Sequence, residues 1–236
     1  MLSKEEGKRY FKQILLEEIG INGQIALKNA KVAVVGAGGL GCPVLQYLAS
    51  TGVGTIGIID FDTVDVSNLH RQILYTTEDV GRKKSELAAY RIKLQNPFIN
   101  TIVHDVLLDE SNVEGILKEY DLVVDGCDNF LTRYTVNDAC VKLNKPLVYG
   151  SILGFEGQIA IFNFKGSKNL RDIFPEPPNA EDVPNCSENG VLGTLPGTIG
   201  TMLAHEAVKL ITNLPVSINQ LRLVNTLDWS IQKIEF

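Results

Sequence analysis

One segment of the chain, residues 32–59, constrains the fold most, because it contains no charged residue and carries seven glycines and Pro43. An uncharged stretch of this length raises the question of a transmembrane helix. Its glycines and proline instead divide it into a strand at about 31–35, a glycine turn, a helix through about Ser50, and a strand at about 55–59. Short connections between strand, helix and strand are typical of a right-handed βαβ unit, so we expect no membrane span.

The composition indicates a substantial core and no general attraction to anionic polymers. The chain has 236 residues, 44% of them hydrophobic, which is enough for one large domain or two small ones. Its 22 basic and 28 acidic side chains give a net charge of -6 at pH 7, which disfavours nucleic acid and membrane surfaces as partners. The N-terminus is charged and lacks an apolar signal core, and no C-x-x-C pair occurs. We therefore expect a cytoplasmic protein with neither a disulfide framework nor a four-cysteine zinc site.

Strands and helices continue to alternate along the chain. Helices are predicted at about 3–19, 82–95, 110–119, 130–144 and 197–212, and strands at about 100–104, 121–125, 146–150, 157–164, 219–224 and 230–235. The first helix has Ser3 and Glu6 in capping-box spacing, and the alternating strand GQIAIFNF is expected to pair antiparallel. The predicted fold class is α/β: a Rossmann-like, largely parallel sheet with flanking helices, an antiparallel extension and an N-terminal helix. We expect one domain over 1–236, with a nucleotide-binding core at about 31–150 and a long crossover loop at about 165–190.

The glycine turn predicts a phosphate-binding site. Gly36, Gly38 and Gly41 stand in G-x-G-x-x-G spacing between a strand and a helix, and Asp60 closes the next strand. The glycines allow a tight turn, close approach of phosphate and close helix packing, while the acid is placed to bind ribose hydroxyls. Packing alone would explain the glycines but would not require Asp60. This motif fits an NAD-dependent dehydrogenase as well as an ATP-dependent enzyme.

The residues after Asp60 favour ATP. A dehydrogenase has no obvious use for the polar group that follows its ribose-binding strand, which consists of Asn68, Arg71, Gln72 and Lys84. In a nucleotidyl-transfer enzyme, arginine and lysine neutralise phosphates and stabilise the departing pyrophosphate. For Arg82 and Lys83 we keep the simpler interpretation of a solvated surface.

A second polar group ends the predicted strand at 121–125. Asp125, Asp128 and Asn129 stand at its carboxyl end, the edge where open α/β sheets bind ligands. A carboxylate there is suited to hold Mg2+ beside a triphosphate. The alternative, that Asp128 or Asn129 only caps the next helix, remains open at this point.

Taken together, these motifs identify a resemblance to the ThiF/MoeB/HesA family, the bacterial relatives of ubiquitin-activating E1 enzymes. The similar stretches run in the family's order from about Arg9 to Ile211: RYFKQILL, GAGGLGCPVLQYLASTGVGTIGIIDFDTVDVSNLHRQ, DVGRKKSE, DGCDNFLTRY, GQIAIF, FPEPP and CSENGVLGTLPGTIGTMLAHEAVK. This pattern is much more specific than the glycine motif alone.

The resemblance implies adenylation of the C-terminal glycine of a ubiquitin-like sulfur carrier, using ATP and Mg2+. It implies that Gly39 lies against the nucleotide, that Asp60 binds ribose, and that Asp128 is associated with Mg2+. The phosphate contacts it implies are Asn68, Arg71, Gln72 and Lys84, and the expected nucleotide-binding set also includes Gly36, Gly38, Gly41, Asp62 and Asn129. The expected catalytic residues are Arg71, Lys84, Asp128 and Cys186.

The sequence departs from the family pattern in two places. Lys12-Gln13 stands where Arg-Gln is usual; that basic residue reaches the partner's ATP, so a homodimer is implied, with Lys12 and Arg9 as candidates for this contact. The two C-x-x-C pairs that hold zinc in many members are missing, so no zinc is expected.

Cys186 has two interpretations. It matches a cysteine that takes part in covalent sulfur chemistry in ThiF-like members, while in MoeB-like members the cysteine is dispensable; a thiol without a role is equally open. Cys42, Cys127 and Cys140 are predicted to be small core residues.

The partners implied are a carrier ending in Gly-Gly, of ThiS or MoaD type, and a separate sulfur donor such as a cysteine desulfurase or rhodanese. Cys186 favours the thiamine-thiazole pathway over molybdopterin synthesis. Two other classes stay open: an NAD-dependent oxidoreductase, and a non-catalytic scaffold that binds the carrier. An E1-like enzyme acting on tRNA is disfavoured by the net charge of -6.

Overall fold

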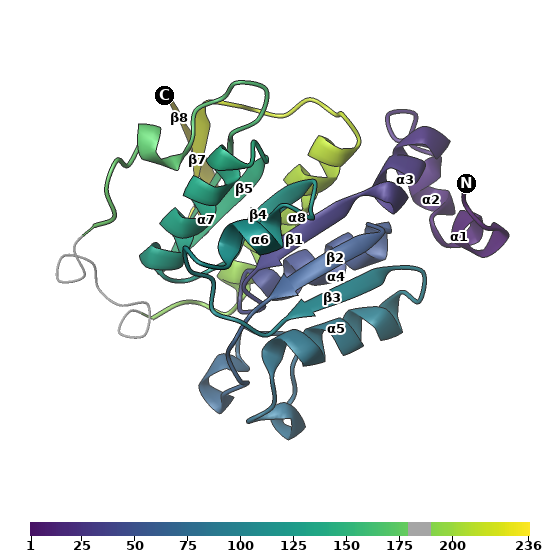
Figure 1. Cartoon of the computed structure of the whole chain (residues 1–236), viewed down its shortest axis with the longest axis horizontal. Helices are drawn as coiled ribbons and strands as arrows, with labels where there is room; N and C mark the ends of the chain where they lie inside the picture. The colour runs from purple at the N-terminus through teal and green to yellow at the C-terminus, as the bar shows by residue number, and fades with distance from the viewer. Residues whose placement is uncertain (179–189) are drawn as a thin grey trace.

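The computed structural model of the chain describes residues 1–178 and 190–236, which contain one eight-stranded sheet in the order β3-β2-β1-β4-β5-β6-β7-β8 (Figure 1). The strands are β1 Lys31–Val35, β2 Thr55–Ile59, β3 Asn100–His104, β4 Leu122–Asp125, β5 Leu147–Leu153, β6 Glu156–Phe162, β7 Gln220–Asn225 and β8 Ser230–Glu235. Pairing is parallel from β3 to β5 and antiparallel from β5 to β8. The predicted α/β class with an antiparallel extension is confirmed.

Helices cover both faces of the sheet. They are α1 Lys4–Arg9, α2 Phe11–Ile14, α3 Gly20–Asn29, α4 Gly41–Thr51, α5 Lys84–Gln95, α6 Val113–Leu117, α7 Phe130–Lys142 and α8 Thr194–Ile211, with single 3-10 turns η1 Val66–Asn68, η2 Thr77–Asp79 and η3 Leu170–Asp172. One core cluster joins the sheet to α4, α5 and α8, and the other joins it to α6 and α7, which lie in front of the sheet in Figure 1.

Alternation along β1 divides its side chains between these two cores. Val32 and Val34 belong to the α4 side and Ala33 and Val35 to the α7 side, as the period of two in a strand requires. The uncharged segment forms the unit β1-α4-β2. Its two strands lie between the two layers of helices, which accounts for the lack of charged residues. Across the described ranges, none of the helices has the length and apolar character needed to cross a membrane.

The N-terminal segment corrects one prediction. The expected helix over 3–19 was wrong: α1 and α2 are separate short helices, and α3, which was not predicted, begins at Gly20. The Ser3–Glu6 capping box does form. The helix breaks at Tyr10 because this ring is drawn into the core at 4% exposure, where its hydroxyl accepts a hydrogen bond from Asn96 Nδ2 at 2.7 Å. Tertiary packing here outweighs local helix propensity.

Two smaller differences lie in the loops. The helix expected at 110–119 is shortened to α6, because Asp109 turns the chain by accepting from the backbone and hydroxyl of Ser111. The described part of the predicted crossover loop contains the turn η3, capped by Asn169.

The strand order sets the place of the site. From β1 the chain builds outward through β2 to β3, then returns to the other side of β1 and continues through β4 and β5. The loops after β1 and β4 therefore leave the sheet in opposite directions, and such a switch point is where open α/β sheets bind ligands.

Candidate functional site

A cavity of about 670 Å³ lies at the carboxyl ends of β1, β2 and β4. It is lined by most of the nucleotide-binding residues predicted from sequence: Gly36, Gly38, Gly39, Asp60, Asp62, Arg71, Gln72, Lys84, Asp128 and Asn129. The same cavity extends along β5 and β6, where Tyr149, Ser151 and Gln158 form part of its wall. The volume is that of a ligand site for a medium-sized molecule.

The glycine turn is built by backbone contacts that exclude side chains. Gly36 has φ +89°, and a Cβ there would stand 2.8 Å from the carbonyl oxygen of Gly126. A Cβ on Gly41 would stand 1.9 Å from the carbonyl oxygen of Gly36. Gly41 thus serves the packing of α4 and does not line the cavity, whereas Gly38 and Gly39 do.

The N-terminus of α4 lies beside the cavity, because Leu40, which directly precedes the helix, lines it. Within the described residues no side chain caps this helix, and its first residues follow directly after the cavity-lining Gly38 and Gly39. The positive end of the helix dipole at this position favours an anion such as phosphate.

Asp60 is fixed beside this turn. Its carboxylate accepts from the backbone N–H of Ala37 at 2.7 Å and of Asp62 at 2.9 Å. Burial raises the pKa of the Asp60 carboxyl, and the Ala37 N–H and Lys84 oppose that rise. Each oxygen keeps a second lone pair, so the group is suited to accept hydrogen bonds from ribose hydroxyls.

Two cationic side chains of the site are held by hydrogen bonds to other residues of the same chain. Lys84 is 5% exposed, and its Nζ donates to the Asp62 carboxylate at 2.9 Å. Arg71 is half-buried and donates from Nη1 to the carbonyl of Ser67 at 3.2 Å. Asn68 does not line the cavity; its carbonyl accepts from the N–H groups of Arg71 and Gln72, so its backbone shapes this turn.

The residues present fit a nucleotide and its Mg2+. Gln72 lines the cavity, and its side-chain oxygen is buried without a hydrogen-bond partner among the described residues. A buried polar atom without a partner is costly, and a ligand donor would satisfy it. The Asp128 carboxylate is exposed at the same wall and offers the oxygen ligands that Mg2+ prefers.

Sequence reasoning missed Arg133 on α7, which is 5% exposed and lines the cavity. Its Nε donates to Asp125 Oδ2 at 3.0 Å, and the Asp125 charge holds the pKa of the arginine above its usual value against the effect of burial. A signal was available: Arg133 shares a helix face with Val136 and Cys140, both buried. A charge on a buried face requires a partner.

One predicted residue lies away from the cavity, and another cannot be placed relative to it because it is outside the described residues. Lys12 is exposed on α2 and does not line this cavity, and Figure 1 places α1 and α2 on the opposite side of the molecule from residues 170–178. Cys186 lies outside the described residues, together with 179–189 of the predicted crossover loop.

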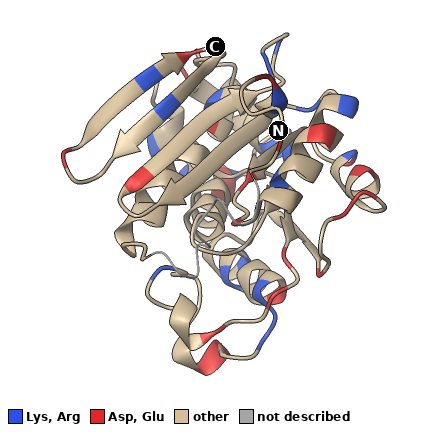
Figure 2. Ribbon diagram, turned by 90° about the vertical axis from the view of Figure 1, so that its left-hand side faces the viewer, with Lys and Arg blue, Asp and Glu red and all other residues tan. Residues whose placement is uncertain are grey.

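Basic and acidic residues are mixed over the part of the chain that the structure describes. In the view of Figure 2 the blue and red segments are interspersed over strands, helices and loops. The cations that line the cavity are thus a local feature that the overall charge does not reveal.

The fold and the cavity together define a class: an α/β protein with a nucleotide-type site at the switch point of its sheet. Residues 10–236 match the ThiF family. The chain belongs to the ThiF family, which confirms the resemblance seen in the sequence.

Individual relatives agree with this assignment. The chain is 48% identical to the sulfur carrier protein adenylyltransferase of Thermus thermophilus, over 98% of this chain and 88% of that protein. It is 49% identical to the probable adenylyltransferase/sulfurtransferase MoeZ of Mycobacterium tuberculosis and 47% identical to the adenylyltransferase and sulfurtransferase MOCS3 of Caenorhabditis briggsae, over 90% and 92% of this chain. It spans about half the length of these last two relatives, 55% and 54%.

Solved structures support the fold. Escherichia coli MccB matches with a TM-score of 0.85 at 22% identity, over 99% of this chain and 70% of that one. PaaA matches with a TM-score of 0.83 at 23% identity, over 99% and 74%. At these identities the likeness concerns the fold.

The described cysteines are predicted to be unreactive in the folded protein. Burial raises the pKa of Cys42 and of Cys140 to about 12 each, and it raises the pKa of Cys127 well above its usual value. Because the thiolate is the nucleophile, a Cys186→Ala variant at pH 8 should show no fast-reacting thiol with a disulfide reagent. All three thiols should react once guanidinium unfolds the chain. A fast phase in the folded variant would contradict the burial of these groups.

Proposed function

We propose that this protein uses ATP to adenylate the C-terminal glycine of a ubiquitin-like sulfur carrier protein. One observation carries the proposal: the glycine turn, the cations Arg71 and Lys84, and the Asp128 carboxylate all line one cavity. The name of the Thermus thermophilus relative supports the same reaction, because the identity of 48% extends over nearly the whole of both chains. The reaction class is nucleotidyl transfer.

The proposed mechanism needs no general base. The carrier carboxylate is already a nucleophile, and it attacks the α-phosphorus while pyrophosphate leaves. Arg71 and Lys84 stabilise the charge that grows on the leaving pyrophosphate, because both are fixed in place before the reaction starts. Mg2+, held at Asp128, would neutralise phosphate charge when bound.

The second half of the cavity suits the carrier's tail. Beyond the nucleotide side, its wall is formed by β5 and β6, where Tyr149 donates to Gln158 at 3.0 Å. A Gly-Gly tail is thin enough to extend along this wall toward the α-phosphate, since it has no side chains. Sulfide-level sulfur delivered by a separate donor would then attack the acyl carbon and displace AMP, giving a thiocarboxylate.

For the pathway, we propose thiamine-thiazole synthesis, with molybdopterin synthesis as the alternative. The preference for the thiamine pathway rests on one residue, Cys186, which matches the cysteine that takes part in covalent sulfur chemistry in ThiF-like members. A comparison of ThiS-type and MoaD-type carriers as substrates distinguishes the two pathways.

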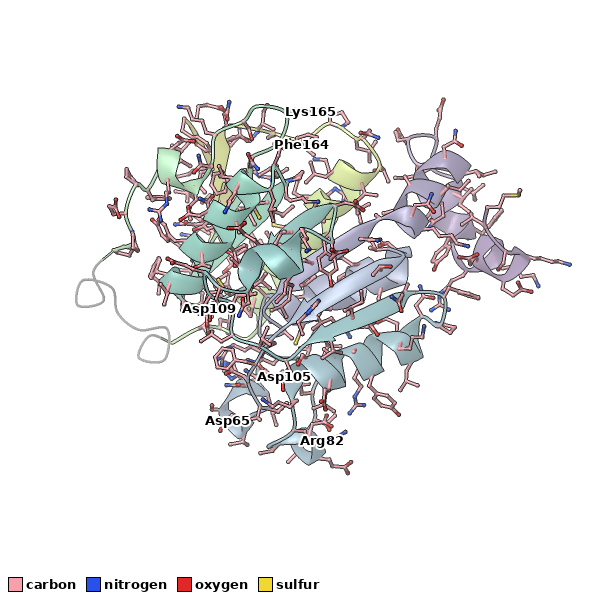
Figure 3. The ribbon with its side chains drawn as sticks, viewed as in Figure 1. Asp65, Arg82, Asp105, Asp109, Phe164 and Lys165 are labelled. Carbon is pink, nitrogen blue, oxygen red and sulfur yellow. The ribbon has the colours of Figure 1, made fainter. Side chains whose placement is uncertain are left out.

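Exchange of labelled pyrophosphate into ATP tests the reaction. The wild type should catalyse exchange with carrier and Mg-ATP, and Arg71→Ala or Asp128→Ala should reduce it by at least about 100-fold, because each removes a fixed charge from the reacting phosphates. Arg82→Ala is the matched control: Arg82 is exposed at the outer end of the connection between β2 and α5, does not line the cavity, and should leave exchange unchanged (Figure 3).

Other outcomes select the rival functions. Absence of exchange with every carrier tested rejects the proposal. NADH binding at millimolar concentration would favour an oxidoreductase, and capture of the carrier without formation of AMP would favour a scaffold.

We also propose a homodimer in which Lys12 enters the partner's site. The segment bearing Lys12 is anchored to the core, since Gln13 Nε2 donates to Gln24 at 2.7 Å and Asn96 donates to Tyr10. Three large hydrophobic side chains near Lys12 are exposed, as expected of an interface: Phe11, Leu15 and Leu16.

Active-site complementation tests this arrangement. Lys12→Ala and Arg71→Ala homodimers should each be nearly inactive, because each lacks a cation in both sites. When equal amounts of the two variants are mixed and exchange subunits, about half of the dimers are heterodimers. One of the two sites in each heterodimer is intact, so about a quarter of all sites should regain activity. If exchange of subunits is verified and no activity returns, Lys12 acts within its own chain or not at all.

A further inference from the structure

A buried ion pair between Arg133 and Asp125 has no part in the mechanism proposed so far. Arg133 is 5% exposed and Asp125 is completely buried, and the two are joined at 3.0 Å. A buried pair of this kind is weak evidence for stability, because apolar residues of similar volume often serve as well. Its position at the cavity wall suggests another role.

The remaining donors of Arg133 connect two parts of the cavity wall. Nη2 donates to the carbonyl oxygens of Cys127 at 2.8 Å and Gly150 at 2.9 Å, and Nη1 donates to Ser151 Oγ at 3.2 Å. With the bond to Asp125, four of the five N–H donors of the guanidinium serve the protein itself. Arg133 is therefore poorly suited to receive a phosphate or carboxylate, and it links the loop after β4 to the middle of β5.

This loop carries Asp128 between two fixed neighbours. On one side, the N–H of Cys127 donates to Asp125 Oδ1 at 2.9 Å, and its carbonyl accepts from Arg133. On the other side, the Asn129 side chain caps α7 through the N–H of Thr132 at 2.8 Å. The backbone is thus held immediately before and after Asp128.

We propose that Arg133 is a positioning residue which, together with Asp125, holds the Asp128 loop in the geometry that nucleotidyl transfer requires. This inference rests on the proposed function. Arg133 acts through the place of Asp128 and without contact to ATP. Lysine would keep the positive charge, but its single nitrogen does not provide the planar fork that reaches all four acceptors.

Arg133→Lys tests the role through its kinetic signature. We expect kcat for pyrophosphate exchange to fall about 10- to 100-fold, because small displacements of reacting groups have effects of this size. The KM for ATP should change little, since no contact to ATP is removed. Arg222→Lys is the matched control: Arg222 pairs with the buried Glu206 at 2.9 Å, and neither residue lines the cavity. This control should keep the wild-type kcat.

Amide hydrogen exchange supplies a readout independent of catalysis. In Arg133→Lys the amide of Cys127 should exchange on the order of tenfold faster while the sheet keeps its protection. Asp125→Asn should act in the same direction and decides the matter if the lysine variant does not fold. Unchanged kcat, or unchanged protection at Cys127, in a folded variant overturns the inference. A wild type without pyrophosphate exchange instead overturns the proposed function, and the amide measurement still decides whether the pair holds the loop.

Discussion

The site depends on the close approach of the two loops that follow β1 and β4. Gly126 donates its N–H to the carbonyl of Val35 at 2.8 Å, and its own carbonyl oxygen would stand only 2.8 Å from a Cβ on Gly36. A side chain at Gly36 would therefore push the two loops apart. This contact brings the glycine turn before α4 and the Asp128 loop to one cavity, although the two segments are far apart in the sequence.

Fixed charges give that cavity its chemical character. Lys84 is paired with Asp62 and Arg133 with Asp125, while the Asp60 carboxylate accepts backbone N–H groups. Such groups need little rearrangement when a nucleotide binds, and preorganisation of this kind is a major source of rate enhancement in phosphoryl and nucleotidyl transfer. The net charge of -6 concerns the surface as a whole and says nothing about this local arrangement.

The parts of the fold that the sequence predicted are those governed by local patterns. The strands predicted at 31–35, 55–59, 100–104 and 230–235 coincide with β1, β2, β3 and β8, because short hydrophobic runs bounded by turn residues define them. The glycine turn and Asp60 were likewise identified from spacing, and the structure brings them together around the cavity.

Features that depend on distant contacts were not predicted. The break at Tyr10 requires Asn96, and the role of Arg133 requires Gly150 and Ser151 on a strand that follows α7. No periodicity within either segment contains that information. The predicted contact of Lys12 involves a second subunit, and that of Cys186 falls outside the described residues, so both stay predictions.

Oxygen tracing tests the central claim, attack of a carrier carboxylate on the α-phosphorus of ATP, most directly. A carrier labelled with 18O in its C-terminal carboxylate would be incubated with ATP, Mg2+, the protein and hydroxylamine, which attacks the acyl carbon and displaces AMP, and the products analysed by mass spectrometry. The account predicts AMP that contains one 18O from the carboxylate, together with unlabelled pyrophosphate, because the bridging oxygen stays on phosphorus when the acyl-adenylate is consumed. Unlabelled AMP, or label in inorganic phosphate with release of ADP, would contradict it.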